Sequence, residues 1–546
     1  MHIPDTQSAS SYFSYPSFAF AAPAEMRGEQ PRHPVIIAGG GPSGLILALE
    51  LARLGVHSVV LEADQTVSEG SRAACVSRRS MEILQLNGVA NQFLAQALPW
   101  THGTSYYRSA PIYRLAMPHS ADERFHPMAN LQQNMFEALL LERTKAYAQL
   151  IEIRWQSKAV GVSQDTDSVQ VTVDTPQGEY TLDGDYVIAA DGARSSLRTA
   201  MGLRLAGESF EGRYLIADIK MASPYPTERR AWFDPPTNPG NTVLMHKMAC
   251  DIWRIDYQLD DDADEVAELE QERVKRRIAQ HLDWIGETTP WQLDWIRLYK
   301  AHCLCLDDYK QGRVFFIGDA AHLVPIFGVR GMNSSIADAN NLGWKLAAVL
   351  KGQAPAQLLD SYSPERRAAT FDIFDNARKS TIFMTPPSAG YRLLRDAALQ
   401  LAIDHQWAKP FINPRQSAPY DYADSSLITP DQGTWQAGPR PGAPMSCVRL
   451  ADGRYLTDLH NGAFMLLHVG PLDDPQLQLA LKNHQLTSLL IAPAEAAVLR
   501  QYDAQAGDAY LIRPDGHVAA RFRRLTVPPL LAALSRALGK TANPTL

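Results

Sequence analysis

A glycine-rich turn near the beginning of the chain has the residue types and the spacing that binding of a dinucleotide requires. The segment 35–44 reads VIIAGGGPSG, so a G-x-G-x-x-G pattern follows an apolar run directly. In such a turn the first glycine allows a tight bend, the second lets backbone amides approach a pyrophosphate, and the third lets the next helix pack on the strand. The dinucleotide-binding residues predicted here are Gly39, Gly41, Pro42, Ser43 and Gly44.

An acidic residue further along refines this prediction. The apolar run Ser58 to Leu61 predicts a strand, and Glu62 follows it at the distance expected of a ribose-binding acid. Its carboxylate would accept hydrogen bonds from the adenosine ribose hydroxyls and would repel a 2'-phosphate. We therefore expect a nucleotide without that phosphate, although this motif does not separate FAD from NAD.

Two later segments carry carboxylates at the ends of predicted strands. Residues 186–198 read YVIAADGARSSLR, and residues 318–322 read GDAAH after the apolar run 314–317. Asp191 and Asp319 would therefore lie at the carboxyl edge of a parallel sheet, where such folds bind ligands. The glycine-rich turn and these two segments occur in the order that is typical of the class A flavoprotein monooxygenases, and residues 34–400 resemble that family. Details such as RRAWFDPP at 229–236 resemble its branch of hydroxyphenylpropionate and phenol hydroxylases.

The resemblance implies a cofactor and a set of contacts. It implies FAD, reduced by NADPH or NADH, and transfer of oxygen from O2 to an aromatic ring through a flavin hydroperoxide. Asp319 would bind a ribityl hydroxyl, and Asp191 would lie near FAD and the nicotinamide. The amides that open the helix at 331–333 would face the flavin or the pyrophosphate. The remaining cofactor contacts implied are Arg72, Gln133, Gly331, Met332 and Asn333.

Few side chains are obligatory for this chemistry, because the cofactor performs the oxygen transfer. The polar candidates for moving a proton or binding a carboxylate are His322, Arg230, Tyr214 and Arg254. Pro325 lies in a loop that borders the oxygen-activating site in the family. Many relatives have two consecutive prolines where this chain has Pro325 and Ile326, so substrate positioning does not carry over from them.

The elements that must position these residues follow from local patterns. A strand beginning at Pro34, a helix over Ile46 to Leu54 and a strand over Ser58 to Leu61 predict a βαβ opening. The stretch 208–295 alternates aromatic and polar residues, which predicts antiparallel strands. Trp232, Phe233, Trp253 and Tyr257 are candidates for covering the substrate ring or for the core of that sheet.

The predicted fold class is α/β: a Rossmann-like FAD-binding domain with an inserted antiparallel substrate sheet and a C-terminal thioredoxin-like domain. Strand-like runs at 463–468 and 509–512 follow a linker rich in Pro, Gly, Ser and Asp. The predicted boundaries are 1–32 for an N-terminal arm on the surface, 33–205 for the first part of the FAD-binding domain with inserted substrate-side segments, and 206–300 for the substrate sheet. Residues 301–415 are predicted as the second part of the FAD-binding domain with a helical connection, and 416–546 as the linker and last domain.

Composition excludes several classes of protein. The 546 residues are 45% hydrophobic and 20% charged, which is ordinary for globular domains, and the net charge of −7 offers no basic field for nucleic acid. No apolar run approaches the roughly 20 residues of a membrane span. Five cysteines without a C-x-x-C pair indicate reduced thiols, and we expect a cytoplasmic protein with no metal site and no dithiol chemistry.

The sequence therefore predicts an FAD-dependent monooxygenase that hydroxylates a phenolic or other aromatic substrate, with a homodimer expected from relatives. Three alternatives stay open: hydroxylation or epoxidation of a polycyclic natural product, a flavin-dependent dehydrogenase or reductase, and a non-catalytic flavin-binding regulatory protein. The identity of the substrate, the side chain that activates it and the choice between NADPH and NADH are not readable from the sequence.

Overall fold

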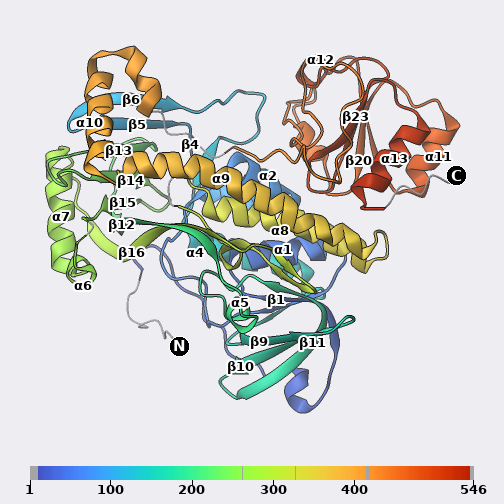
Figure 1. Ribbon diagram of the computed structural model, residues 1–546, viewed down its shortest axis with the longest axis horizontal. Coiled ribbons are helices and arrows are strands. Elements are labelled where there is room, and N and C mark those ends of the chain that lie inside the picture. The colour runs from blue at the N-terminus through green and yellow to red at the C-terminus, as the bar shows by residue number, and fades with distance from the viewer. Residues whose placement is uncertain (1–9, 261, 326–327, 413–417, 541–546) are drawn as a thin grey trace.

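The computed structural model describes residues 10–260, 262–325, 328–412 and 418–540 of the chain. Figure 1 shows a nucleotide-binding region at one end, a second sheet at the other, and long helices between them, with the C-terminal domain beside these helices. Nowhere in these ranges is a helix long and apolar enough to cross a membrane. The same ranges contain no group of three or more His, Cys, Asp or Glu side chains placed to hold a metal ion.

The first sheet is built on a parallel core with the order β17-β18-β11-β1-β2-β8, and β9 and β10 extend it through β11. Ile36 of β1 pairs with Val187 on one side and Val59 on the other, and all three are fully buried. Continuous apolar runs are typical of strands covered on both faces. The strands are β1 (Arg32–Ala38), β2 (Ser58–Leu61), β8 (Ile151–Arg154), β9 (Lys158–Gln164), β10 (Val169–Thr175), β11 (Gly178–Ala189), β17 (Lys310–Gln311) and β18 (Val314–Phe316).

Helices pack on this sheet and on one another. Helix α1 begins at the glycine-rich turn and lies against α8, which Figure 1 shows running across the middle of the molecule. The two backbones approach closely at Gly343, where a Cβ atom would lie 2.8 Å from the Cβ of Glu50. The helices are α1 (Pro42–Arg53), α2 (Arg78–Leu86), α3 (Ala90–Gln96), α4 (Gln133–Thr144), α5 (Ser196–Ala200), α8 (Gly331–Leu350) and α9 (Tyr362–Met384).

The second sheet has the order β19-β16-β12-β15-β14-β13-β5-β6 and is the predicted substrate sheet. It also contains strands from outside the block 206–300, because β5 and β6 come from the segment 33–205 and β19 from the segment 301–415. One face is covered by α6 (Glu265–Glu268) and α7 (Gln271–Trp284), and α10 (Ala389–Asp404) packs at the β5–β6 end. The strands are β5 (His102–Tyr107), β6 (Ala110–Ala116), β12 (Ala206–Lys220), β13 (Arg229–Phe233), β14 (Thr242–Lys247), β15 (Ile252–Gln258), β16 (Gln292–Cys305) and β19 (His322–Leu323).

Strand alternation divides the predicted ring-covering aromatics between the two faces of this sheet. Trp232, Trp253 and Tyr257 belong to the apolar cluster under α7. Phe233 belongs to the cluster on the opposite face, with Met384 of α9. Only Phe233 among the four candidates therefore lies on the face that α9 covers, and the other three form core.

The C-terminal domain contains a four-stranded sheet with the order β21-β20-β22-β23. β20 is parallel to β21 and antiparallel to β22, and β22 and β23 form an antiparallel hairpin. Helices α11 and α12 flank β21 in the sequence, and α13 follows β23. The elements are β20 (Met465–Val469), α11 (Pro475–Asn483), β21 (Thr487–Ile491), α12 (Ala496–Gln501), β22 (Ala509–Ile512), β23 (Val518–Phe522) and α13 (Val527–Ala537).

The N-terminal arm packs on the FAD-binding region through aromatic side chains. Phe18 stacks on Trp155 with ring centroids 4.0 Å apart. The hydroxyl of Tyr15 accepts a hydrogen bond from the Gly70 amide at 2.9 Å. The arm thus supports the loop that contains Arg72.

Candidate active site

The three glycines of the first motif meet three different steric demands. Gly39 has φ +111°, and a Cβ there would overlap the carbonyl oxygen of Ala190. A Cβ on Gly44 would overlap the carbonyl oxygen of Gly39. At Gly41, by contrast, an added Cβ would meet no described atom within 4 Å. Gly39 and Gly44 therefore build the turn, whereas the space beside Gly41, Pro42 and Ser43 at the start of α1 is free for a ligand.

Glu62 stands beside this turn, as the sequence predicts. Its carboxylate accepts hydrogen bonds from the amides of Gly40 at 2.7 Å and Asp64 at 2.9 Å. Burial raises its pKa to about 7, against the lowering effect of these amides. The Glu62 carboxylate is thus bonded to the amide next to Gly41. A ribose attached to a pyrophosphate bound beside Gly41 would extend toward this carboxylate.

The second half of the predicted site reaches the same place from the far end of the sequence. Gly318 has φ +59°, and a Cβ there would lie 2.9 Å from the hydroxyl of Ser335 and 3.1 Å from that of Ser43. The segment Gly318–Asp319, called the GD motif below, therefore meets the start of α1 and helix α8 at this glycine. No larger residue would allow the three segments to approach so closely.

Asp319 follows this contact, and its side chain is exposed. Desolvation by the surrounding protein raises its pKa, with His322, Arg72 and Arg198 opposing that rise. This placement suits a carboxylate that hydrogen-bonds a ligand hydroxyl.

Arg72 and Gln133 lie on two neighbouring segments of the chain. Arg72 has φ +34°, which is uncommon for a residue with a side chain and holds its backbone in a tight bend. Gln133 accepts a hydrogen bond from the Ala73 amide at 3.3 Å and donates one to Glu137 at 2.8 Å. The charge of Arg72 acts on both Asp319 and Glu137, so these predicted cofactor residues converge.

Asp191 lies two residues beyond the end of β11, at the carboxyl edge of the sheet. One carboxylate oxygen accepts a hydrogen bond from the Leu197 amide at 3.2 Å. The other oxygen, Oδ1, is buried and has no partner among the described residues, and burial raises the pKa of the group. An oxygen left without a donor is consistent with a donor supplied by a ligand.

Helix α8 begins with Gly331, Met332 and Asn333 in its first turn, whose amides have no partner within the helix. The Asn333 side chain accepts from the Ser77 amide at 2.8 Å and donates to the carbonyl of Cys75 at 3.0 Å. It therefore fastens α8 to the short strand β3 (Cys75–Ser77). Any cofactor contact of Asn333 must come from its backbone.

His322 is fully buried beside Gly318 and Asp319, and its predicted role in moving a proton or binding a carboxylate stays a prediction. Its Nε2 lies 2.8 Å from Asp338, and both side chains are fully buried. Asp338 also accepts from the Gly318 amide at 3.0 Å and from Arg366 at 2.6 Å. Burial would raise the Asp338 pKa, but Arg366 and His322 outweigh it and keep the pKa below its usual value. His322 thus helps to fix the GD motif.

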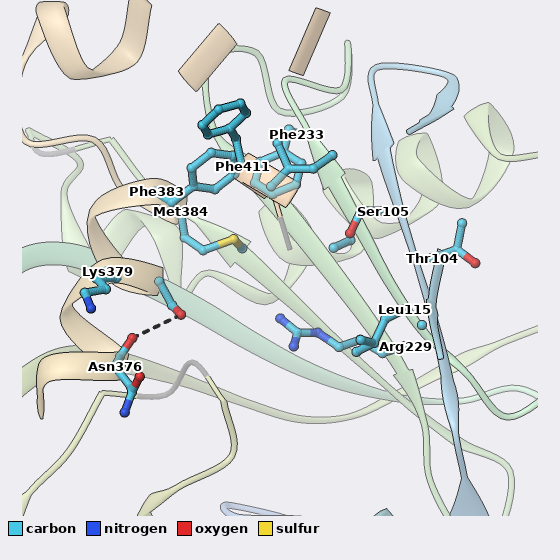
Figure 2. Close-up of a pocket in the computed structure, with 14 residues that line it drawn as sticks. Thr104, Ser105, Leu115, Arg229, Phe233, Asn376, Lys379, Phe383, Met384 and Phe411 are labelled. Atoms are coloured by element: carbon cyan, nitrogen blue, oxygen red, sulfur yellow. Dashed lines mark hydrogen bonds between the residues drawn. The ribbon is translucent and has the colours of Figure 1, made fainter. Parts of the chain in front are cut away.

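A cavity of about 210 Å³ opens between the substrate sheet and α9 (Figure 2). Its walls are Ser105 and Leu115 of the sheet edge, Phe233, and Phe383 and Met384 of α9, among other residues. Figure 2 shows the Arg229 guanidinium pointing into the space between the sheet and α9. Pro325 is buried at the end of a described segment, and its neighbour Ile326 lies outside the described residues.

Arg230 lies on the opposite face of the sheet and is not among the residues that line this cavity, so its predicted role stays a prediction. Its guanidinium stacks 3.7 Å from the ring centroid of Tyr225 and 5.4 Å from that of Trp253. Neighbouring residues of a strand point to opposite sides. The cavity is lined instead by its neighbour Arg229, which the sequence analysis did not single out.

Arg229 begins a row of polar side chains that sequence reasoning missed as a group. Arg229 pairs with His246, His246 with Arg254, and Arg254 with Asp218 across four adjacent strands. Arg254 donates to Asp218 at 3.3 Å and to the carbonyl of Arg72 at 2.5 Å. The row therefore joins the pocket to the predicted FAD-binding loop. The sequence alone did not indicate this row of polar side chains. It becomes visible only when β14 and β15 are paired and their alternating side chains are assigned to the two faces of the sheet.

Comparison with known proteins places this geometry in a family. Residues 32–377 match the FAD binding domain family. A 3-(3-hydroxyphenyl)propionate/3-hydroxycinnamic acid hydroxylase of Mycolicibacterium smegmatis is 30% identical over 371 residues, 67% of this chain and 64% of that protein. The rifampicin monooxygenase of Streptomyces venezuelae is 28% identical and aligns over 89% of this chain and 94% of its own length.

Solved structures agree in fold. The flavin-dependent monooxygenase PieE, solved with FAD and substrate, superposes with a TM-score of 0.78 at 24% identity over 93% of this chain and 99% of that chain. Aklavinone-11 hydroxylase, solved with FAD and aklavinone, gives a TM-score of 0.75 at 23% identity, over 94% of this chain and 100% of that chain. The chain therefore belongs to the FAD binding domain family and is a class A flavoprotein monooxygenase.

Proposed function

We propose that this protein hydroxylates a phenolic or other aromatic substrate with FAD, NADPH or NADH, and O2. The observation that carries the proposal is the convergence of the Gly41 turn, the Arg72 loop, Asp191, Asp319 and the start of α8 around one space next to the substrate sheet. FAD, when bound, supplies the redox chemistry and the activation of oxygen. The named relatives are hydroxylases and monooxygenases, which supports the same class of reaction.

The residues of the chain have distinct tasks in this proposal. Gly41, Pro42, Ser43 and the amides of α1 would bind the pyrophosphate, and Glu62 the adenosine ribose. Asp319, Arg72 and Gln133 would hold the ribityl chain and its surroundings. The amides of residues 331–333 would place partial positive charge beside the flavin ring. The sheet face and α9 would exclude water from the substrate ring, with Pro325 in the bordering loop.

A polycyclic substrate is the second candidate. Relatives named for rifampicin, anhydrotetracycline and aklavinone act on larger molecules. The cavity of about 210 Å³ is smaller than the roughly 300–1,000 Å³ of ligand sites in general, which favours a single aromatic ring. A flavin-binding regulatory protein is the remaining alternative and would show no turnover with any ligand.

We also propose that the last domain is thioredoxin-like. The strand order 2-1-3-4, counted from β20, with one parallel and two antiparallel pairs, supports this, and so does the arrangement of its helices. The domain boundaries predicted from the sequence, a homodimer and a cytoplasmic location remain proposals of the same kind.

Reconstituted protein tests the main proposal. Phenolic acids and larger aromatics are added in turn, and oxidation of NADPH and of NADH is followed together with the mass of the product. A supporting result is a substrate that both stimulates coenzyme oxidation and gains one oxygen atom. Coenzyme oxidation with every compound yielding only hydrogen peroxide would refute the monooxygenase assignment for that panel, and a colourless protein that binds no FAD would refute the flavoprotein assignment.

A further inference from the structure

The N-terminal arm connects the substrate sheet with the FAD-binding region. The amide of Ser11 donates to the carboxylate of Asp294 in β16 at 2.6 Å. Further along the arm, the amide of Phe18 donates at 2.8 Å to the carbonyl of Gln65, which follows β2. The part of the arm between these two anchors, residues 12–17, is therefore fixed at both ends, and it contains two tyrosines.

The arm contacts a loop, residues 68–73, whose conformation needs support from outside. Arg72 in this loop has φ +34°, which is uncommon for a residue with a side chain. Gly70 is buried with φ +72°, and a Cβ there would overlap the indole of Trp295. Backbone in sparsely populated conformations persists only where the surrounding structure fixes it. The position of the Arg72 side chain therefore depends on the contacts of this loop, called the Arg72 loop below.

Tyr15 of the arm joins the Arg72 loop to the start of α4 through one oxygen atom. Its hydroxyl accepts from the Gly70 amide at 2.9 Å and from Nδ2 of Asn134 at 3.1 Å. Burial raises the pKa of Tyr15, with these two donors opposing the rise, so the phenol stays neutral. Asn134 is fully buried and directly follows Gln133 in the sequence. One hydroxyl thus holds the neighbours of both predicted cofactor contacts, Arg72 and Gln133.

The other bonds of the loop do not replace this contact. The Gln133 amide donates to the carbonyl of Ser71 at 3.1 Å. Arg254 of the substrate sheet donates to the hydroxyl of Ser71. These bonds begin at Ser71, whereas the amide of Gly70 bonds the Tyr15 hydroxyl. Tyr15 therefore acts on a part of the loop that these bonds do not reach.

We propose that Tyr15 is a positioning residue of the cofactor site, whose hydroxyl holds the Arg72 loop against the start of α4 in the geometry in which Arg72 and Gln133 contact FAD. This inference rests on the proposed function, which assigns these two residues to the cofactor. Tyr15 precedes residue 32, where the match to the family begins, so the arm adds this support to the fold of the family. Without the hydroxyl, the loop populates conformations that do not bind FAD, and the affinity falls in proportion to the competent fraction.

Dissociation of FAD from the full-length holoenzyme tests this role without any turnover. The holoenzyme is diluted serially, and released FAD is read from its fluorescence. Tyr15→Phe removes the hydroxyl and keeps the ring, so we expect binding of FAD to weaken about 3- to 10-fold. The matched control is Tyr502→Phe in the C-terminal domain, where the lost hydroxyl donates to the carbonyl of Ser446 at 2.9 Å. It should lower stability in denaturant unfolding and leave the FAD affinity unchanged.

A double-mutant cycle shows whether Tyr15 acts through the Arg72 loop. Arg72→Gln should weaken FAD binding by loss of a charge-assisted contact. In that background, Tyr15→Phe should weaken binding by a smaller factor than in wild type, because residues that act together are not additive. Tyr12→Phe gives a second test should Tyr15→Phe fold poorly. The Tyr12 hydroxyl donates to Oδ1 of Asn134 at 3.2 Å, so its loss loosens the same amide and should weaken FAD binding in the same direction.

Four outcomes would overturn the positioning role: wild-type FAD affinity in Tyr15→Phe, wild-type affinity in Tyr12→Phe where Tyr15→Phe does not fold, a loss of the same size in Tyr502→Phe, or equal factors in the two backgrounds of the cycle. These outcomes leave the proposed function intact when Arg72→Gln still weakens binding. Wild-type protein that binds no FAD, or Arg72→Gln that binds it as tightly as wild type, would instead refute the proposed cofactor site and this inference with it.

Discussion

Replacement of Gly41 by alanine is the sharpest test of the cofactor site. Gly41 has φ −75° and ψ −175°, which alanine adopts without strain, and its Cβ would meet no described atom within 4 Å. The apoprotein should therefore be as stable as wild type, or slightly more stable because the unfolded chain loses freedom. The methyl group would instead occupy the space proposed for the pyrophosphate. Overpacking by about 1–3 kcal/mol corresponds to roughly tenfold to hundredfold weaker binding of FAD.

Gly44→Ala is the matched comparison, because its Cβ would overlap the carbonyl of Gly39 within the turn itself. FAD affinity is measured by titration of the apoproteins, and stability by denaturant unfolding without FAD. We expect Gly41→Ala to lose affinity only, and Gly44→Ala to lose stability as well. If Gly41→Ala bound FAD as tightly as wild type, the placement of the pyrophosphate beside Gly41 would be refuted. If its apoprotein lost as much stability as Gly44→Ala, the claim that the space beside Gly41 is free of protein atoms would be refuted.

Three further predictions concern the surrounding framework. Glu365→Gln breaks the buried pair with Arg513, whose two N–H groups donate to Glu365 at 2.7 and 3.0 Å. The substitution should lower the free energy of unfolding, measured with denaturant, by about 3–5 kcal/mol. A loss below about 1 kcal/mol would contradict this prediction. Burial raises the pKa of Glu365 and of Asp338, but their cationic partners outweigh it and hold both pKa values below normal. Both carboxylates therefore contribute fully to stability above about pH 4, the range where unfolded carboxyls titrate. This contribution falls as the pH drops through the lower pKa values of the folded state. Equal slopes of the free energy of unfolding against pH in wild type and Glu365→Gln over this range would contradict the prediction. Arg230→Met should leave kcat/KM unchanged, since the side chain lies under α7, and a loss of kcat/KM in steady-state assays would contradict this prediction.

The sequence by itself determined the local parts of the cofactor site. The glycines of the first motif are required by backbone angles and by contacts within one turn, so their spacing is sufficient to predict the βαβ opening. The strand Ser58–Leu61 and the helix beginning at 331 were likewise predicted from residues close together in the chain. The order of the three motifs was enough to predict the family, since each motif is a short segment with its own chemistry.

The direction in which the side chains of the second sheet point could not be predicted from the sequence and follows from strand pairing. Strand β13 reads RRAWF and is largely buried on both faces, so it has no polar and apolar alternation from which a direction could be inferred. Its pairing with β14 and β5 sets the direction, and a shift by one residue would exchange Arg229 and Arg230. Pairs such as Glu365 with Arg513, 148 residues apart, are likewise invisible in the sequence. The physical reason is that contacts of this kind depend on how separate elements pack, and no local pattern records that.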